Sequence, residues 1–237
     1  MMQGMSIAPF RSALIVGVGD GLSASLARLL SGKGVGLMLA ARDVAKLAKL
    51  AAATGARCFA CDAGDASQVA ALFAATDAAI GAPDLVVYNA SRRVQGPIAT
   101  LDPAEVEAAI RVTAFGGFLV AQAAARRMLD AGRGTILLTG ASAGVKGFAQ
   151  SAPFAMGKFA LRGLAQSMAR ELHPKGVHVA HVVIDGGIRS ARRTPDPQAP
   201  DALLDPDAIA EAYFQLATQP RSAWAWEIEL RPWVERF

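Results

Sequence analysis

The feature that most constrains the fold of this 237-residue chain is a regular alternation of short apolar runs with stretches of helical spacing. The apolar runs contain few polar residues, a pattern typical of strands that are covered on both faces. The predicted strands are Ser12–Val18, Gly34–Ala41, Arg57–Cys61, Asp84–Asn89, Gly134–Gly140, Val177–Ile184 and Trp226–Leu230. We therefore expect a central, mostly parallel sheet of seven strands.

Helical stretches separate these strands, at Leu22–Leu30, Val44–Ala53, Ser67–Ile80, Pro103–Asp130, Phe154–His173 and Pro206–Thr218. Asp43, Asp65 and Asp102 are candidate N-caps, and Pro103 and Pro206 suit first helical positions. This alternation predicts right-handed βαβ units, and hence a doubly wound α/β fold of the Rossmann type with helices on both faces of the sheet. The length suits a single domain, 1–237, whose ligands bind beyond the carboxyl ends of the strands.

Composition and charge exclude several classes of function. Apolar residues make up 53% of the chain and charged residues 19%, which is too apolar for a disordered chain. The net charge of +4 comes without a long basic run, so no nucleic-acid partner is expected. Since no apolar run is long enough to cross a bilayer and residues 1–11 lack a secretory signal pattern, we expect a cytoplasmic protein that does not bind a membrane.

The two cysteines, Cys58 and Cys61, are predicted to be small strand residues. A redox pair of this spacing normally opens a helix, whereas the local sequence here indicates a strand. A zinc site would need two more ligands, and the three histidines lie more than a hundred residues further along the chain. No metal site is therefore expected.

A glycine cluster follows the first predicted strand, in V-G-V-G-D-G-L-S at residues 16–23. Gly17, Gly19 and Gly21 would let the backbone turn tightly and approach a diphosphate closely. The helix that follows would direct its free N–H groups and the positive end of its dipole at that anion. This position predicts a dinucleotide-binding turn, although the spacing is not G-x-G-x-x-G.

With later motifs, this turn resembles that of the short-chain dehydrogenase/reductase family, which reads T-G-x-x-x-G-x-G. Val16 stands here in place of the threonine and Ser23 in place of the last glycine, and the resemblance extends from about residue 12 to the end of the chain. It implies that the turn, including Asp20 and Leu22, binds the diphosphate side of a nicotinamide dinucleotide.

Other positions of the family match singly. Asp62, followed by Ala63, stands where the family has an acid that binds adenine, and Y-N-A-S at residues 88–91 resembles the family's N-A-G, which implies that Asn89 and Ala90 lie beside the cofactor. D-G-G-I at residues 185–188 resembles P-G-x-V, which implies that Gly186 and Ile188 lie along the nicotinamide; Asp185 replaces the proline.

The choice between NAD and NADP depends on the end of the second strand. Arg42 there could form charge-assisted hydrogen bonds with a 2′-phosphate, which favours NADP(H) over NAD(H). Asp20 argues for NAD, because NADP-using relatives often have a basic residue in the glycine turn. Alternatively, Arg42 simply points into solvent.

Residues 154–158 read F-A-M-G-K, so Phe154 and Lys158 share a face of a predicted helix. The family motif is Y-x-x-x-K, in which the tyrosine transfers a proton while the lysine holds the nicotinamide ribose and lowers the tyrosine pKa. The resemblance also implies that Ser142 binds the substrate oxygen, and Thr113 stands at the place of an asparagine that organises a proton relay. Ser142 and Lys158 are thus the expected catalytic residues, and two of four catalytic positions have changed.

Two functions remain open at this point. The first is a slow or atypical oxidoreductase that transfers a hydride between NADP(H) or NAD(H) and a carbonyl or alcohol, with Ser142 or a water beside Lys158 meeting the proton requirement. The second is a non-catalytic dinucleotide-binding protein, a sensor or scaffold on the same fold. In a third reading, Phe154 merely packs and Lys158 is a surface charge.

The resemblance also bears on substrate and assembly. Three prolines in segment 190–205 predict an irregular loop, which by the resemblance would cover the substrate. Arg92, Arg93, Arg192 and Arg193 could favour an anionic substrate. Relatives commonly pair through the two long helices and the last strand, whose end carries three tryptophans, so we expect a homotetramer or homodimer.

Overall fold

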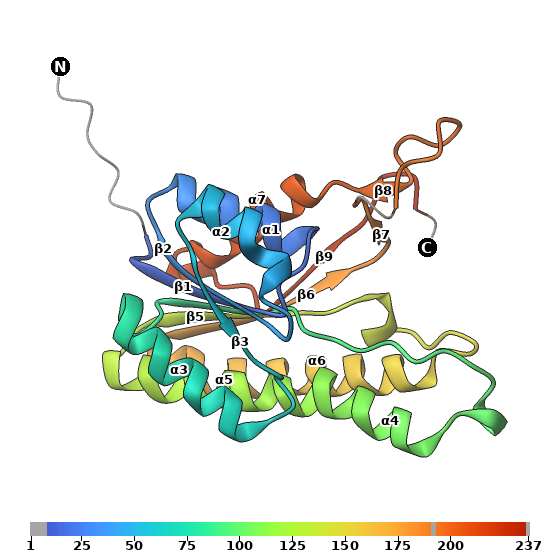
Figure 1. The fold of residues 1–237 in the computed structure, drawn as a ribbon, viewed down its shortest axis with the longest axis horizontal. Coiled ribbons are helices and arrows are strands. Elements are labelled where there is room, and N and C mark those ends of the chain that lie inside the picture. The colour runs from blue at the N-terminus through green and yellow to red at the C-terminus, as the bar shows by residue number, and fades with distance from the viewer. Residues whose placement is uncertain (1–8, 191–192, 236–237) are drawn as a thin grey trace.

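The computed structural model describes residues 9–190 and 193–235, and its centre is the predicted seven-stranded sheet (Figure 1). The strands run in the order β3-β2-β1-β4-β5-β6-β9, and every neighbouring pair is parallel. Their bounds are β1 Ser12–Val16, β2 Gly36–Ala41, β3 Arg57–Ala60, β4 Leu85–Tyr88, β5 Gly134–Thr139, β6 Val177–Ile184 and β9 Glu227–Leu230. The order reverses between β1 and β4, which opens a crevice at the carboxyl ends of these strands.

Helices cover both faces of the sheet (Figure 1). One layer contains α1 Leu22–Gly32, α2 Ala48–Thr54 and α7 Pro206–Ala217. The other contains α3 Ala66–Ile80, α4 Pro103–Ile110, α5 Gly116–Ala131 and α6 Ala152–Leu172. The prediction of a doubly wound, Rossmann-type α/β domain is therefore confirmed.

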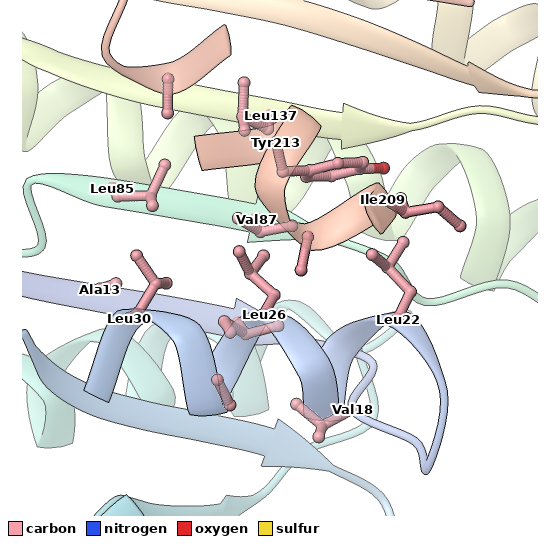
Figure 2. Packing of buried hydrophobic residues seen from close by; sticks show 14 of the residues in the cluster. Ala13, Val18, Leu22, Leu26, Leu30, Leu85, Val87, Leu137, Ile209 and Tyr213 are labelled. Atoms are coloured by element: carbon pink, nitrogen blue, oxygen red, sulfur yellow. The ribbon is translucent and has the colours of Figure 1, made fainter. Parts of the chain in front are cut away.

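Alternating strand residues fill two separate cores. Ala13 and Ile15 face α1 and α7, whereas Leu14 and Val16 face α3, α5 and α6. Figure 2 shows the first of these cores, in which Tyr213 of α7 packs among leucines of α1 and the central strands. Burial of the central strands β1, β4, β5 and β6 on both sides explains their uninterrupted apolar sequence, whereas the edge strands β3 and β9 are partly exposed.

The predicted helix Pro103–Asp130 is interrupted where the sequence gives no sign of a break. A π-helical turn at Arg111–Phe115 separates α4 from α5, and the hydroxyl of Tyr88 donates a hydrogen bond to the carbonyl of Val112 within it. Tyr88 is fully buried. Taken together, Pro103–Ala131 is apolar and long enough to cross a bilayer, but its buried face packs against the sheet.

Two other predictions need correction. Asp43 is not the N-cap of α2, which begins at Ala48; it accepts a hydrogen bond from the amide of Ala45, the first residue of a short 3₁₀ turn, Ala45–Leu47. Segment 190–205 is not wholly irregular, because β8 Leu203–Leu204 pairs with β7 Gly187–Ile188. Asp65 and Asp102 do cap α3 and α4, and Pro103 and Pro206 stand in the first turns of α4 and α7.

The last strand is tied to the sheet by a polar cluster. Glu227 of β9 accepts two hydrogen bonds from Arg162 of α6, at 2.6 and 2.7 Å, and lies 2.9 Å from Nδ1 of His181. Burial lowers the pKa of His181 to about 4, so this imidazole is neutral at pH 7. Trp224 stacks on His178 and Trp226 packs against the second core, whereas Trp233 is exposed.

Candidate active site

A cavity of about 840 Å³ lies at the carboxyl ends of β1, β2, β3 and β4, within the range of ligand pockets, roughly 300–1,000 Å³. Most of the predicted cofactor residues line it, from four different strand ends: Gly17, Gly19, Asp20, Arg42, Asp62, Ala63, Asn89 and Ala90. The remaining predicted ones lie outside its lining: Gly21, Leu22, Lys158, Gly186 and Ile188. The side chain of Leu22 instead packs in the core beneath α1.

The glycine turn fits an approaching diphosphate. Gly17 has a φ of +84°, and a Cβ on it would lie 2.3 Å from the backbone nitrogen of Ala90, so no larger residue fits there. Around Gly19, by contrast, a Cβ would find no atom within 4 Å. The backbone at this position is therefore open to a ligand.

The first turn of α1 is also suited to an anion. Its N-cap is Gly21, no side chain caps it, and no acidic residue stands in the first turn. Its free amides and dipole are thus unopposed. A Cβ on Gly21 would lie 3.9 Å from Ile188, which brings the predicted nicotinamide segment next to the glycine turn although that segment does not line the cavity.

Ser23 and Asn89 connect the turn to the next strand. The side-chain amide of Asn89 donates a hydrogen bond to the hydroxyl of Ser23 at 2.7 Å and lies 3.5 Å from the carbonyl of Gly17. Ser23, which replaces the last glycine of the family turn, thus holds β4 against it. On the other side, Asp62 accepts a hydrogen bond from the amide of Gly64 at 2.9 Å.

Beyond the cavity, Phe154 and Lys158 share a face of α6, as predicted. Both are buried, with 5% and 3% of each residue exposed, and the Lys158 ammonium lies 5.7 Å from the centre of the Phe154 ring. The ammonium donates a hydrogen bond to the carbonyl of Thr139 at 2.7 Å. Burial, and then the charge of Arg93, lowers the pKa of Lys158 to about 7. A surface role for Lys158 is therefore wrong.

Ser142 and Thr113 lie against the same helix. A Cβ on Gly144, in the 3₁₀ turn Ser142–Gly144, would lie 3.2 Å from the carbonyl oxygen of Lys158, and one on Gly157 would lie 2.8 Å from Cβ of Thr113. Among the described residues, the Ser142 hydroxyl makes one hydrogen bond, a long one of 3.5 Å to the carbonyl of Ile184, and so remains available to a ligand. The Thr113 hydroxyl accepts a hydrogen bond from the amide of Arg92.

Neither tyrosine replaces the hydroxyl that Phe154 lacks. Tyr88 donates to Val112, and Tyr213 donates to the hydroxyl of Thr139 at 2.9 Å. Burial raises the pKa of both phenols.

Comparison with known proteins assigns the chain to a family. A family model described as short chain dehydrogenase matches residues 11–199. The chain belongs to the short-chain dehydrogenase family.

Similar members of the short-chain dehydrogenase family cover nearly the whole chain. A short-chain dehydrogenase from Rhodopseudomonas palustris is 35% identical, with a TM-score of 0.82 over 94% of this chain and 98% of its own. A metagenomic short-chain oxidoreductase, solved in complex with NADP, is 33% identical, with a TM-score of 0.81 over 94% of this chain and 97% of its own. An uncharacterized oxidoreductase of Staphylococcus aureus strain N315 is 27% identical over 234 residues, 96% of this chain and 100% of its own.

Sequence reasoning missed several basic residues of this dehydrogenase site. Arg28, Lys46 and Lys49 line the cavity together with Arg42. Arg28 follows Ala24 by one helical turn, and both line the cavity, so helical spacing from the glycine turn could have indicated it. Arg93 was predicted only as part of a basic pair, and its place over the Phe154 ring, 4.3 Å from the ring centre, has no signal in the sequence.

Proposed function

We propose that the chain is an oxidoreductase that binds a nicotinamide dinucleotide and reduces a carbonyl or oxidises an alcohol. The observation that carries the proposal is the juxtaposition, at one end of the sheet, of a cavity with an open glycine turn and a buried lysine on α6. The complex of a relative of 33% identity with NADP supports the choice of cofactor class.

The proposed roles follow from the contacts. Gly17, Gly19 and the first turn of α1 hold the diphosphate, and Asp62 with Ala63 borders the adenine. Lys158 binds the ribose that carries the nicotinamide. When bound, the nicotinamide supplies or accepts a hydride. Ser142 orients the substrate oxygen through a hydroxyl that has no strong partner among the described residues.

The missing hydroxyl of Phe154 lowers the rate without excluding the reaction. A positioned general acid or base contributes about 10²–10⁴-fold, whereas holding the reactants together can be worth about 10⁵ M or more in effective molarity. The proposed enzyme is therefore slow or specialised, with Ser142 or a water beside Lys158 meeting the proton requirement.

NADP(H) is the proposed cofactor. Arg42, Arg28, Lys46 and Lys49 give the cavity four cations, of which Lys46 is paired with Asp43 at 3.1 Å. The cavity also contains three carboxylates, Asp20, Asp43 and Asp62, of which Asp20 opposes a 2′-phosphate, so the excess is one positive charge. The excess of positive charge favours the additional phosphate of NADP(H).

The alternative is a non-catalytic protein that binds a dinucleotide as a sensor or scaffold. It is favoured by Phe154, because this buried ring fills the place of the proton donor and no tyrosine replaces it within the described chain.

Steady-state turnover over a panel of ketones and alcohols, with wild type and Phe154→Tyr side by side, distinguishes the two functions. We expect slow turnover by wild type. Tight binding of NADPH without any turnover, together with a gain of activity in the variant, would leave the non-catalytic function. Slower turnover in the variant than in wild type would assign Phe154 to a working site. Absence of affinity for NADPH and NADH would overturn both functions.

The further proposals concern assembly and location. Both helices expected to pair subunits carry exposed apolar side chains, Phe118 and Leu129 on α5 and Met156 and Phe159 on α6, which supports a homodimer or homotetramer. Sedimentation velocity tests this assembly. Residues 190–205 are proposed to cover the substrate, which we take to be an anionic small molecule, and the protein is proposed to be cytoplasmic.

A further inference from the structure

The substrate end of the site is bordered by many basic side chains, and most of them are neutralised. Arg92 forms an ion pair with Glu105, and Arg189 forms one with Asp205 at 2.8 Å. Asp185, the residue in place of the family's proline, pairs with Lys146 at 3.6 Å and with Arg231 at 3.4 Å. These four cations therefore leave little net charge at the substrate end of the site.

Arg93, Arg193 and Lys158 are different, because none of them has a carboxylate within 4 Å in residues 9–190 and 193–235. The guanidinium of Arg93 lies 4.3 Å from the centre of the Phe154 ring, and the Lys158 ammonium lies 5.7 Å from the same centre. Arg193 lies against β7, since a Cβ on Gly187 would lie 2.6 Å from its Nη1. Two unneutralised cations thus lie beside one aromatic ring, and a third lies against β7.

The charges of these groups affect one another. Desolvation lowers the pKa of Arg93, and the charge of Arg193 lowers it further. The charge of Arg93 in turn lowers the pKa of Lys158. Like charges held together without counter-charge create a positive potential that favours a bound anion.

Neither Arg93 nor Arg193 lines the dinucleotide cavity, whose own cations are Arg28, Arg42, Lys46 and Lys49. Arg93 lies over the ring that stands at the family's tyrosine position, next to where the substrate would react. Titration of the NADPH-saturated protein distinguishes a substrate anion from the phosphates of the cofactor.

We propose that Arg93, held over the Phe154 ring, and Arg193 together bind an anionic group of the substrate, a carboxylate or a phosphate ester. This inference rests on the oxidoreductase function proposed above and names the substrate class of the same site. Arg192, the neighbour of Arg193 in the sequence prediction, lies outside the described residues, and Arg92 is neutralised by Glu105. In this arrangement Phe154 contributes to substrate binding, because the face of its ring orients the Arg93 guanidinium by a cation–π contact.

Calorimetric titration of malonate and of inorganic phosphate into the NADPH-saturated protein tests the proposal. Binding is expected to weaken as NaCl rises. Arg93→Gln should lower the affinity about 10- to 100-fold, the effect of losing charge-assisted hydrogen bonds. Arg193→Gln should lower it in the same direction, and Arg93→Lys should restore part of it. Tighter binding of malonate would assign a carboxylate, and tighter binding of phosphate a phosphate ester.

Arg92→Gln is the matched control, because it removes the same charge one residue away and should change the affinity less than about twofold. Equal affinities in wild type, Arg93→Gln and Arg193→Gln, or no binding of either anion, would overturn the proposal and leave ordinary solvated arginines. NADPH fluorescence titration of each variant distinguishes failure of the proposed oxidoreductase function from failure of the anion-binding proposal. If no nucleotide binds, the oxidoreductase function fails, while malonate titration of the nucleotide-free protein still tests Arg93 and Arg193.

Discussion

The ammonium of Lys158 donates a hydrogen bond to the backbone carbonyl of Thr139 at 2.7 Å, and only 3% of the lysine is exposed. The ammonium is buried, and no carboxylate lies within 4 Å of it in the described chain, so the charged form of Lys158 is poorly stabilised. This one bond fixes the lysine at the carboxyl end of β5, next to Phe154. It also makes the protonation of Lys158 part of the stability of the fold.

The stability of the nucleotide-free protein should therefore depend on pH through Lys158. Its pKa is about 7 in the folded state and about 10.4 in the unfolded chain, so between these values the unfolded state binds one more proton. The free energy of unfolding should then rise with pH from about 7 to 10, by up to about 1.4 kcal/mol per pH unit. Urea unfolding of wild type and Lys158→Met across this range measures the effect as a difference in slope.

The Lys158→Met variant removes the titrating group, and the unpaired Thr139 carbonyl that it leaves adds an offset that does not vary with pH. Other titrating groups cancel in the comparison. Parallel pH dependences in the two proteins would mean that Lys158 titrates near its ordinary pKa.

Thr139 also faces the opposite layer, where its hydroxyl accepts a hydrogen bond from Tyr213 of α7 at 2.9 Å. Both side chains are buried, so Thr139→Val should leave the Tyr213 hydroxyl unpaired and lower the free energy of unfolding by about 1–3 kcal/mol. Adding Tyr213→Phe should recover much of that loss, because the double variant has no unpaired hydroxyl. Urea unfolding of the two single variants and the double variant gives the coupling; additive losses would show that the bond contributes nothing.

The parts of the structure that depend on local sequence were predictable. Strands buried on both faces and a glycine turn before α1 follow from runs of a few residues, and the one-turn spacing of Phe154 and Lys158 fixed their common face. The π turn was not predictable, because it depends on contacts between distant segments: the hydroxyl of Tyr88 with Val112, and the approach of Gly157 to Thr113. The position of Arg93 over Phe154 joins a loop to a helix some sixty residues later in the chain, and no periodicity encodes it.

Gly17 and Gly19 offer a test of the glycine turn within one motif. Gly17→Ala would place a methyl group 2.3 Å from the nitrogen of Ala90 and strain a φ of +84°, whereas Gly19→Ala meets no atom within 4 Å. The first variant should lose about 2 kcal/mol or more, which lowers Tm by about 4–8 °C in a chain of this size. The second should stay within about 2 °C of wild type. Thermal unfolding followed by circular dichroism measures both, and equal Tm values would contradict the close approach of β1 to β4.

The preference for NADP(H) should reside in Arg42. If its guanidinium binds a 2′-phosphate, Arg42→Ala should lower the affinity for NADPH about 10- to 100-fold and leave that for NADH within about twofold, because only the first ligand carries the phosphate. Arg57→Ala is the control: it removes the same charge from an exposed residue of β3 outside the cavity. Fluorescence titrations with NADPH and with NADH measure both affinities of wild type, Arg42→Ala and Arg57→Ala. An equal loss of affinity for NADPH and NADH would mean that Arg42 contacts a part that the two nucleotides share. Asp20, which lines the same cavity, would then favour the unphosphorylated ribose of NAD(H).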